Sequence, residues 1–380
     1  MNKIFNLTFI LLFANLSNCS FQSDIFNRMN KENIGNNLII SPLSIFQALS
    51  LAANGARKDT LSEMLDVLQY ENIDELNKIN LQILSVVKNF TTIDIANAVM
   101  TRFDPLKEFK LIAEKYLAPI EPLASAEQVN DWCKSKTHGK IDKILDELDP
   151  NTLMILLNAV YFKGEWLSKF YDELTAKRPF FNLGNEEIKV DTMNQIEYFN
   201  YYEDKKCQAI KLHFMEDDMS AIIILPSKGT DINKFINSLS ISNEEYNKII
   251  DGFKYVKVHL QLPKFELEFK ENLNEILKSL GMYNAFSFKD ADFTGLKEEG
   301  EIFINSVNHK TYLKVSEVGC EAAGITEIEI QETSDFPDEE EKIYDMKINR
   351  PFLFLLINSK LPKEHNLVFM SKIEKLEQTN

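Results

Sequence analysis

Residues 152–162, TLMILLNAVYF, constrain the fold of this chain more than any other segment. Apolar side chains occupy both alternating sets of positions, so both faces of an extended strand would be apolar. Such a strand is stable only inside a sheet that other layers cover on each side. The segment therefore predicts a sheet with a buried central strand.

Four more segments have the length and composition of strands. They are residues 219–226 (MSAIIILP), 256–263 (VKVHLQLP), 351–358 (PFLFLLIN) and 366–373 (NLVFMSKI). The last two predict a C-terminal hairpin. Because helix patterns dominate the first 150 residues and strand patterns dominate the rest, the chain is expected to be α+β without regular βαβ alternation.

Helix boundaries are predicted from capping patterns. Thr60 with Glu63 and Ser125 with Gln128 have the spacing of capping boxes ahead of apolar-periodic runs. Gly281 follows the helical pattern ENLNEILKSL and predicts a helix C-terminus there.

Composition limits the class of protein and its partners. The chain has 380 residues, 44% of them hydrophobic and only 12 glycines, so it can bury a large core. Nothing between residues 22 and 330 resembles a linker, which favours one continuous unit. The net charge of -16 repels phosphate backbones and anionic membrane surfaces. We therefore expect no nucleic-acid, membrane or heparin-type partner.

The N-terminus resembles a secretory signal peptide. Lys3 precedes an apolar run over residues 4–13, and small or polar residues follow, so cleavage is expected between Asn18 and Ser20. A membrane anchor is the alternative, but the run is too short to span a bilayer. We expect residues 1–19 to be removed and the mature chain to be extracellular. Asn89 starts a glycosylation sequon whose use the sequence leaves open.

The four cysteines, at positions 19, 133, 207 and 320, show no metal-ligand or redox spacing. Cys133 and His138 lie close in sequence, but they lack further ligands. No metal site, no cofactor and no dense disulfide framework are predicted.

Residues 316–341, SEVGCEAAGITEIEIQETSDFPDEEE, combine two patterns that conflict. From Cys320 to residue 330, small or apolar residues alternate with mostly polar ones, which is the pattern of a half-buried strand. An acidic tract that contains proline follows directly, and no sheet accommodates such a tract. The segment therefore has the pattern of a strand that is followed directly by a solvated loop.

Three long motifs resemble the signatures of the serpin family. They are NLIISPLSIFQALSLAANGARKDT at 37–60, the stretch from VNDWCKSKTHGKIDKIL to LLNAVYFKGEW at 129–166, and EVGCEAAGIT followed by RPFLFLLIN. LPKFELE at 262 and DFTGL at 292 extend the resemblance, which runs from about residue 24 to 374.

The resemblance implies a serpin fold with three β-sheets, about eight or nine helices and an exposed reactive loop near residues 317–346. Residues 20–380 would form a single serpin domain. Serpins are irreversible suicide inhibitors of serine, and sometimes cysteine, proteases. The protease attacks the loop, the loop inserts into the main sheet, and the trapped protease is distorted. The implied protein is a monomer whose partner is a target protease, and it is not an enzyme.

The resemblance also assigns roles to individual residues. The hinge that inserts first would comprise Glu317, Gly319, Cys320, Glu321, Ala322, Ala323, Gly324, Ile325 and Thr326. The shutter, a buried polar network under the opening sheet, would comprise Ser41, Ser44, Asn158 and His309. The breach, where the loop enters, would comprise Gly164, Trp166 and Lys264, with Lys264 paired to Glu317. A satisfied core histidine is the simpler interpretation of His309.

Two hinge positions depart from the family pattern. Cys320 stands where Thr or Ser is usual, and an exposed thiol there would be open to oxidation that blocks insertion. Ile325 stands where a small residue is usual, although it would point outward. Counting along the family pattern from Glu317, the resemblance implies a reactive bond at Thr333-Ser334. The distal part of the loop is longer than usual, so Lys342-Ile343 is an alternative for a trypsin-like target.

Two other classes of function compete with inhibition. A serpin-fold carrier, chaperone or storage protein would not insert its loop, and bulky or charged inward residues would mark it. None occurs before residue 328. A hydrolase lacks support because no G-x-S-x-G or G-D-S-G-G motif occurs. Activation by a polyanion is not expected, since the region from Leu68 to Ile95 lacks a basic cluster.

Overall fold

The computed structural model describes residues 20–216, 218–239, 244–320 and 342–378. The α-helices are α2 (Phe21–Glu32), α3 (Pro42–Gly55), α4 (Lys58–Leu68), α5 (Ile73–Val87), α6 (Lys107–Lys115), α7 (Ala126–Lys136), α8 (Ile232–Ser238), α9 (Glu244–Asp251) and α10 (Asn274–Leu280). The strands are β1 (Leu38–Ile40), β2 (Ile93–Thr101), β3 (Ile120–Pro122), β4 (Met154–Phe162), β5 (Gly164–Glu165), β6 (Ala176–Phe181), β7 (Glu187–Glu203), β8 (Cys207–His213), β9 (Met219–Pro226), β10 (Lys254–Pro263), β11 (Phe265–Asn272), β12 (Ser306–Val315), β13 (Gly319–Cys320), β14 (Tyr344–Lys347), β15 (Phe352–Asn358) and β16 (Leu367–Ile373).

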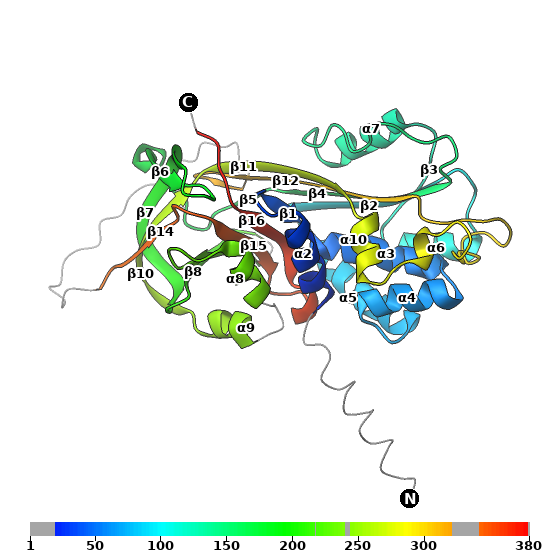
Figure 1. The fold of residues 1–380 in the computed structure, drawn as a ribbon, viewed down its shortest axis with the longest axis horizontal. Coiled ribbons are helices and arrows are strands. Elements are labelled where there is room, and N and C mark those ends of the chain that lie inside the picture. The colour runs from blue at the N-terminus through cyan, green and yellow to red at the C-terminus, as the bar shows by residue number, and fades with distance from the viewer. Residues whose placement is uncertain (1–19, 217, 240–243, 321–341, 379–380) are drawn as a thin grey trace, which may run out of the picture.

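The predicted central strand is confirmed. All nine residues of β4 are buried, and it pairs antiparallel with β2 and parallel with β12. These strands belong to a seven-stranded sheet in the order β3-β2-β4-β12-β13-β5, with β11 on the other edge of β12. In Figure 1 this sheet runs along the molecule, with α7 above it and α3 below.

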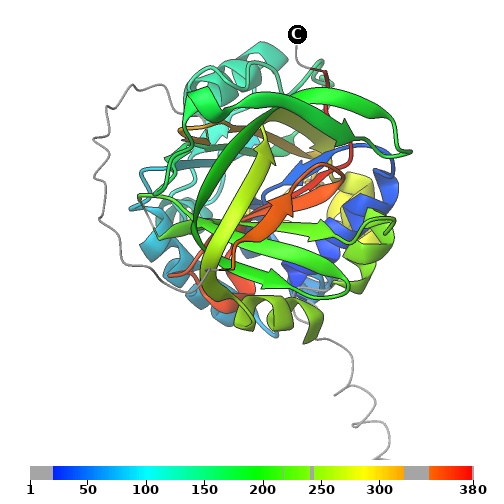
Figure 2. The same cartoon turned by 90° about the vertical axis from the view of Figure 1, so that its left-hand side faces the viewer.

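The remaining nine strands are joined in one sheet, β1-β16-β15-β9-β8-β7-β10-β14, with β6 on β7. The sequence led us to expect three sheets, and hydrogen bonds within the described residues join the strands into two. The 17-residue strand β7 is the cause, because it pairs with β6, β10 and β8 along successive parts of its length. Figure 2 shows β10 and β14 side by side at one end of the molecule. The C-terminal hairpin β15–β16 is confirmed.

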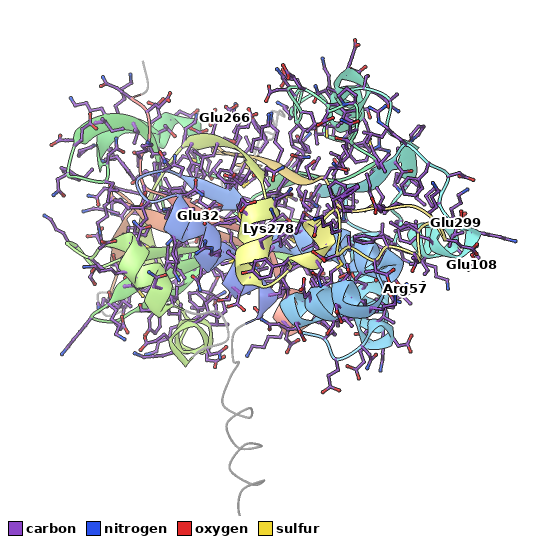
Figure 3. All side chains as sticks on the ribbon, turned by 45° about the vertical axis from the view of Figure 1, so that its right-hand side comes forward. Glu32, Arg57, Glu108, Glu266, Lys278 and Glu299 are labelled. Atoms are coloured by element: carbon purple, nitrogen blue, oxygen red, sulfur yellow. The ribbon has the colours of Figure 1, made fainter. Side chains whose placement is uncertain are left out.

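Helix α3 lies in the core, and all fourteen of its residues are buried. Ser41 caps its N-terminus, Pro42 follows at the first turn, and the helix ends at Gly55. The large charged side chains labelled in Figure 3, such as Glu108 and Glu299, stand at the surface. Within the described segments, no helix is long and apolar enough to cross a bilayer.

One capping prediction is confirmed and one is wrong. Ser125 accepts a hydrogen bond from Gln128 N at 3.1 Å, and the Gln128 side chain accepts from Ala124 N at 2.9 Å. Thr60 does not begin a helix, because α4 already starts at Lys58. The hydroxyl of Thr60 instead accepts from Asp292 N, so a tertiary contact uses the group that local pattern assigned to a cap. Gly281 ends α10 at φ 119°, as predicted.

Candidate functional site

The parallel pairing of β4 with β12 forms the seam of the large sheet, from Ser306↔Ile155 to Tyr312↔Tyr161. Above the seam the chain leaves β12, turns at residues 316–318 and enters β13. Both the backbone N and the Oγ of Ser316 donate to Gly319 O, at 2.8 and 3.0 Å. β13 then pairs antiparallel with β12 (Val315↔Cys320) and with β5 (Cys320↔Gly164). The first residues after the turn therefore already form a short strand at the top of the seam.

Two glycines make this short strand possible. A Cβ atom on Gly319 would lie 2.0 Å from the carbonyl oxygen of Gly164. A Cβ atom on Gly164 would lie 2.9 Å from ring atoms of both Phe162 and Phe214. A side chain at position 319 would push β13 away from β5, so these backbones approach closely only with glycine there, and a side chain at position 164 would displace the two aromatic rings.

Trp166 stabilises the turn at residues 316–318 through two hydrogen bonds. Its Nε1–H donates to Ser316 O at 3.0 Å, and its backbone N–H donates to Val318 O at 2.9 Å. The indole is fully buried and stacks on Phe214 with a centroid separation of 4.3 Å. The predicted breach residues Gly164 and Trp166 thus meet at the point where the chain leaves β12.

Glu317 is anchored at the same turn by an ion pair. Lys264 Nζ lies 2.9 Å from Glu317 Oε2, and Thr175 Oγ1 donates to Glu317 Oε1 at 2.8 Å. Burial alone would raise the pKa of Glu317, but hydrogen bonds from Lys264, from its own backbone and from Thr175 outweigh it, so the pKa lies below its ordinary value. The carboxylate is charged and satisfied. Sequence reasoning missed Thr175, which lies in an irregular segment without a pattern.

The four predicted shutter residues form one buried network. Asn158 on β4 and His309 on β12 are paired across the seam. The Oδ1 atom of Asn158 accepts from His309 Nδ1 and, at 2.7 Å, from Ser44 Oγ. His309 Nε2 accepts from Ser41 N at 3.2 Å. The network therefore connects both sides of the seam to the N-terminus of α3.

Burial lowers the pKa of His309 to about 3, so the imidazole is neutral. A neutral ring with its proton on Nδ1 fits both contacts, because Nδ1–H donates to Asn158 and Nε2 accepts from Ser41. The Nδ2 group of Asn158 donates to Asn97 Oδ1 at 2.5 Å and completes the network. Sequence reasoning missed Asn97. An asparagine inside the apolar strand at 93–101 was the signal that could have found it.

The structure places the thiol of Cys320 in the core. Its side chain is fully buried in the main core cluster, and burial raises the pKa of the thiol well above its ordinary value. In this structure the thiol is therefore inert and protected from the oxidation that an exposed thiol would undergo. The hydrophobic environment tolerates Cys in place of Ser because a thiol loses little on leaving water.

The other hinge residues, 321–326, and the bond Thr333-Ser334 lie outside the described residues. The alternative bond, Lys342-Ile343, is described. Ile343 is 48% exposed, and Lys342 Nζ lies 3.9 Å above the ring of Tyr344. Tyr344 is the first residue of β14, which pairs with β10 from Val258↔Tyr344 onward. This bond thus directly precedes a strand that is fixed in the sheet.

Comparison with known proteins identifies the family. The sequence model described as Serpin (serine protease inhibitor) matches residues 16–376. The chain belongs to the serpin family. This serpin is 31% identical to Iripin-2 of Ixodes ricinus over 361 residues, with 90% of this chain and 88% of the relative covered. It is 30% identical to the leukocyte elastase inhibitor of Xenopus tropicalis, with 88% and 93% covered.

Solved structures agree with the fold. The native state of the thermophilic serpin tengpin superposes with a TM-score of 0.84 at 31% identity, and 94% of this chain and 92% of that chain are covered. Serpin-12 of Manduca sexta superposes with a TM-score of 0.81 at 27% identity, with 94% and 98% covered. The α+β serpin fold is confirmed, and the described residues contain nine α-helices.

Proposed function

We propose that this serpin is a secreted, irreversible suicide inhibitor of a serine protease, acting through cleavage of its loop and insertion of the loop at the β4–β12 seam. The observation that carries the proposal is β13. Its two residues already lie in the sheet, antiparallel to β12, at the upper end of the seam.

The register of β13 predicts which residues of β12 a longer inserted strand would pair with. If the Val315↔Cys320 pairing continued downward residue by residue, residues 323–329 would lie opposite residues 312–306 of β12. Those residues of β12 are the ones now paired with β4. Insertion of the hinge would therefore replace the parallel β4–β12 pairing with two antiparallel pairings, one to each of these strands. The pairing of β13 with β12 would keep its present register.

The energy of insertion favours the exchange. Each new ladder hydrogen bond contributes about 0.5–1.5 kcal/mol net. Because Cys320 faces the core, the period of two places residues 322, 324, 326, 328 and 330 on the same inward face. The first of these are small and can enter between strands, and Ile328 and Ile330 would add about 1.5–3 kcal/mol each on burial. Glu321, Glu327 and Glu329 would lie on the opposite face and stay in water.

We place the reactive bond at Thr333-Ser334. A protease holds several extended residues on both sides of the bond in its cleft. Cleavage at Lys342-Ile343 would require Tyr344 and its neighbours to leave β10, whose pairing they complete. This constraint supports the more proximal bond.

Export, domain extent, partner and assembly are parts of the same proposal. The apolar N-terminal run supports removal of residues 1–19 and secretion of residues 20–380 as one serpin domain. The relative named as a leukocyte elastase inhibitor supports a protease partner. We propose a monomer without catalytic activity of its own.

The deciding experiment mixes the mature chain with elastase-, chymotrypsin- and trypsin-like proteases and looks for a complex that survives boiling in detergent. Mass spectrometry of the released fragment identifies the bond. Cleavage without a stable complex, for every protease, would contradict inhibition. The carrier, chaperone or storage alternative is separated by melting temperature, since a loop that cannot insert leaves the melting temperature unchanged after cleavage.

A further inference from the structure

A cavity of about 520 Å³ opens where three turns meet, formed by residues 181–185 after β6, 228–231 after β9 and 349–351 after β14. We call it the Arg350 cavity. Its size lies within the range of pockets that hold small organic ligands, roughly 300–1,000 Å³. The backbone joins two of the turns directly, because Phe181 N donates to Asn349 O at 2.8 Å. Figure 1 shows β6 and β14 at the same end of the molecule.

The cavity contains two cations for which the described residues provide no ion-pair partner. Arg350 is half-buried. Its Nε donates to Pro226 O at 2.9 Å and its Nη1 to Asn349 Oδ1 at 3.2 Å. No carboxylate of the described residues pairs with Arg350, and its Nη2 has no hydrogen-bond partner among them. Burial lowers the pKa of Arg350, because the charged guanidinium is partly removed from water.

Lys228 supplies the second cation. It is exposed at the cavity, and within the part of the chain that the structure describes its ammonium group forms no ion pair. Asp231 is the only acidic residue of the lining, and its Oδ1 accepts from Asn233 N and Lys234 N at the start of α8. The lining therefore carries a net positive charge on a protein whose net charge is -16.

The rest of the lining includes an apolar wall. Phe181, Leu183 and Pro351 contribute carbon surface, and Leu183 is 42% exposed although it is large and apolar. A guanidinium with free donors beside such a wall matches a ligand that has an anionic group on an apolar body. Inorganic anions would satisfy the cations and leave the wall in water.

We infer that the Arg350 cavity binds a small organic anion, a carboxylate or sulfonate on an aryl or alkyl body, with its charged group between Arg350 and Lys228. The inference is independent of protease inhibition. A bound anion would also stabilise the folded chain by mass action, because the cavity exists only when the three turns are assembled.

The test is calorimetric titration of the intact mature chain with 1-naphthoate and with its neutral counterpart 1-naphthamide. We expect 1-naphthoate to bind and to raise the melting temperature, and the amide to bind about tenfold or more weakly. Lys228→Gln should weaken naphthoate binding by about threefold to tenfold without affecting the fold, because the side chain is exposed and unpaired. Arg350→Gln should abolish it.

Two controls keep the result interpretable. Lys134→Gln removes an exposed lysine on α7, far from the cavity, and should leave naphthoate binding unchanged. Arg350→Lys keeps a cation if Arg350→Gln fails to fold, and should bind more weakly than the unmodified chain because the fork of donors is lost. The inference is overturned if 1-naphthoate shows no binding at roughly 5 mM, if the amide binds equally well, or if Lys228→Gln binds like the Lys134→Gln control.

Discussion

His309 on β12 and Asn158 on β4 are opposed across the seam, and the imidazole Nδ1–H donates to the Asn158 side chain. This contact ties together the two strands that the proposed insertion must separate. The same Asn158 oxygen also accepts from Ser44 on α3, so the helix below is linked to the seam. Opening the seam therefore requires this buried network to be broken or rearranged.

Asn158→Ala should destabilise the native chain. The change leaves His309 Nδ1–H and Asn97 Oδ1 without their partner, whereas Ser44 Oγ–H keeps Ser41 O at 3.3 Å, and each buried unsatisfied group costs about 1–3 kcal/mol. We expect a loss of about 2–5 kcal/mol in the free energy of unfolding by urea. Asn151→Ala, at an exposed turn, is the control and should change it by less than about 0.5 kcal/mol. A loss no larger than that of the control would contradict the network.

His309 should make the free energy of unfolding depend on pH. Burial depresses its pKa to about 3 from the ordinary 6.5, so the unfolded chain binds a proton that the native chain does not. The contribution is fully present above pH 6.5 and is lost as pH falls toward 3, at up to about 1.4 kcal/mol per pH unit. Burial likewise lowers the pKa of His365, to about 4, and lowers the pKa of His213, so three histidines contribute to the slope.

The histidine contributions are separated by His309→Gln, because a glutamine side chain can donate to Asn158 and accept from Ser41. Urea unfolding between pH 7 and pH 4 should show a shallower slope for this variant, by about one proton. Asn151→Ala, a non-titrating change at an exposed turn, is the control and should keep the full slope. Parallel curves for the unmodified chain and His309→Gln would show that His309 is accessible to protons in the native state.

Lys264 and Glu317 should be coupled in stability. Glu317→Gln removes a carboxylate whose pKa is lowered in the native state, so its contribution is present above the ordinary value of 4.5 and is lost as pH falls. A double-mutant cycle with Lys264→Gln at pH 7 should give a coupling of about 1 kcal/mol or more, because the Glu317 carboxylate is largely buried. Lys270→Gln, which breaks an exposed pair with Asp146, should cost less than about 0.5 kcal/mol. A coupling near zero would refute the anchoring role.

Gly319→Ala should displace β13. The added methyl would overlap the Gly164 carbonyl, so the short strand cannot keep its pairing with β5. We expect a lower melting temperature and slower formation of the protease complex. Gly35→Ala is the matched control, since Gly35 also has a positive φ but open space around its Cβ position. It should lose only about 1 kcal/mol, and equal effects of the two changes would exclude a steric origin.

Cys320 should resist thiol reagents in the native chain. Cys133, Cys207 and Cys320 are all buried, and burial raises the pKa of each thiol. A disulfide-exchange reagent should label none of them within minutes in a chain that begins at Ser20, and three in guanidinium. Cys320→Ser should remove one of the three. Rapid native labelling that this variant abolishes would mean that β13 opens in solution.

The sequence alone determined the covered central strand of this protein, and its resemblance to serpins indicated four members of the buried network. TLMILLNAVYF had to be a covered central strand because both of its faces are apolar, and the motifs around Ser41, Asn158 and His309 resembled a family whose sheet opens. These are local patterns and periodicities, which one chain segment carries by itself. The capping box at Ser125 was readable for the same reason.

Only the tertiary structure decided which groups meet. Thr60 fits a capping box in sequence, yet its hydroxyl accepts a hydrogen bond from the backbone N–H of Asp292. Cys320 looked like a loop thiol, yet Val315 and Gly164 enclose its backbone in the sheet and its side chain lies in the core. The contacts of Asn97 and Thr175, and the place of Arg350 in a cavity, became visible only in three dimensions. Hydrogen-bond partners and burial depend on segments distant in sequence, and no local period records them.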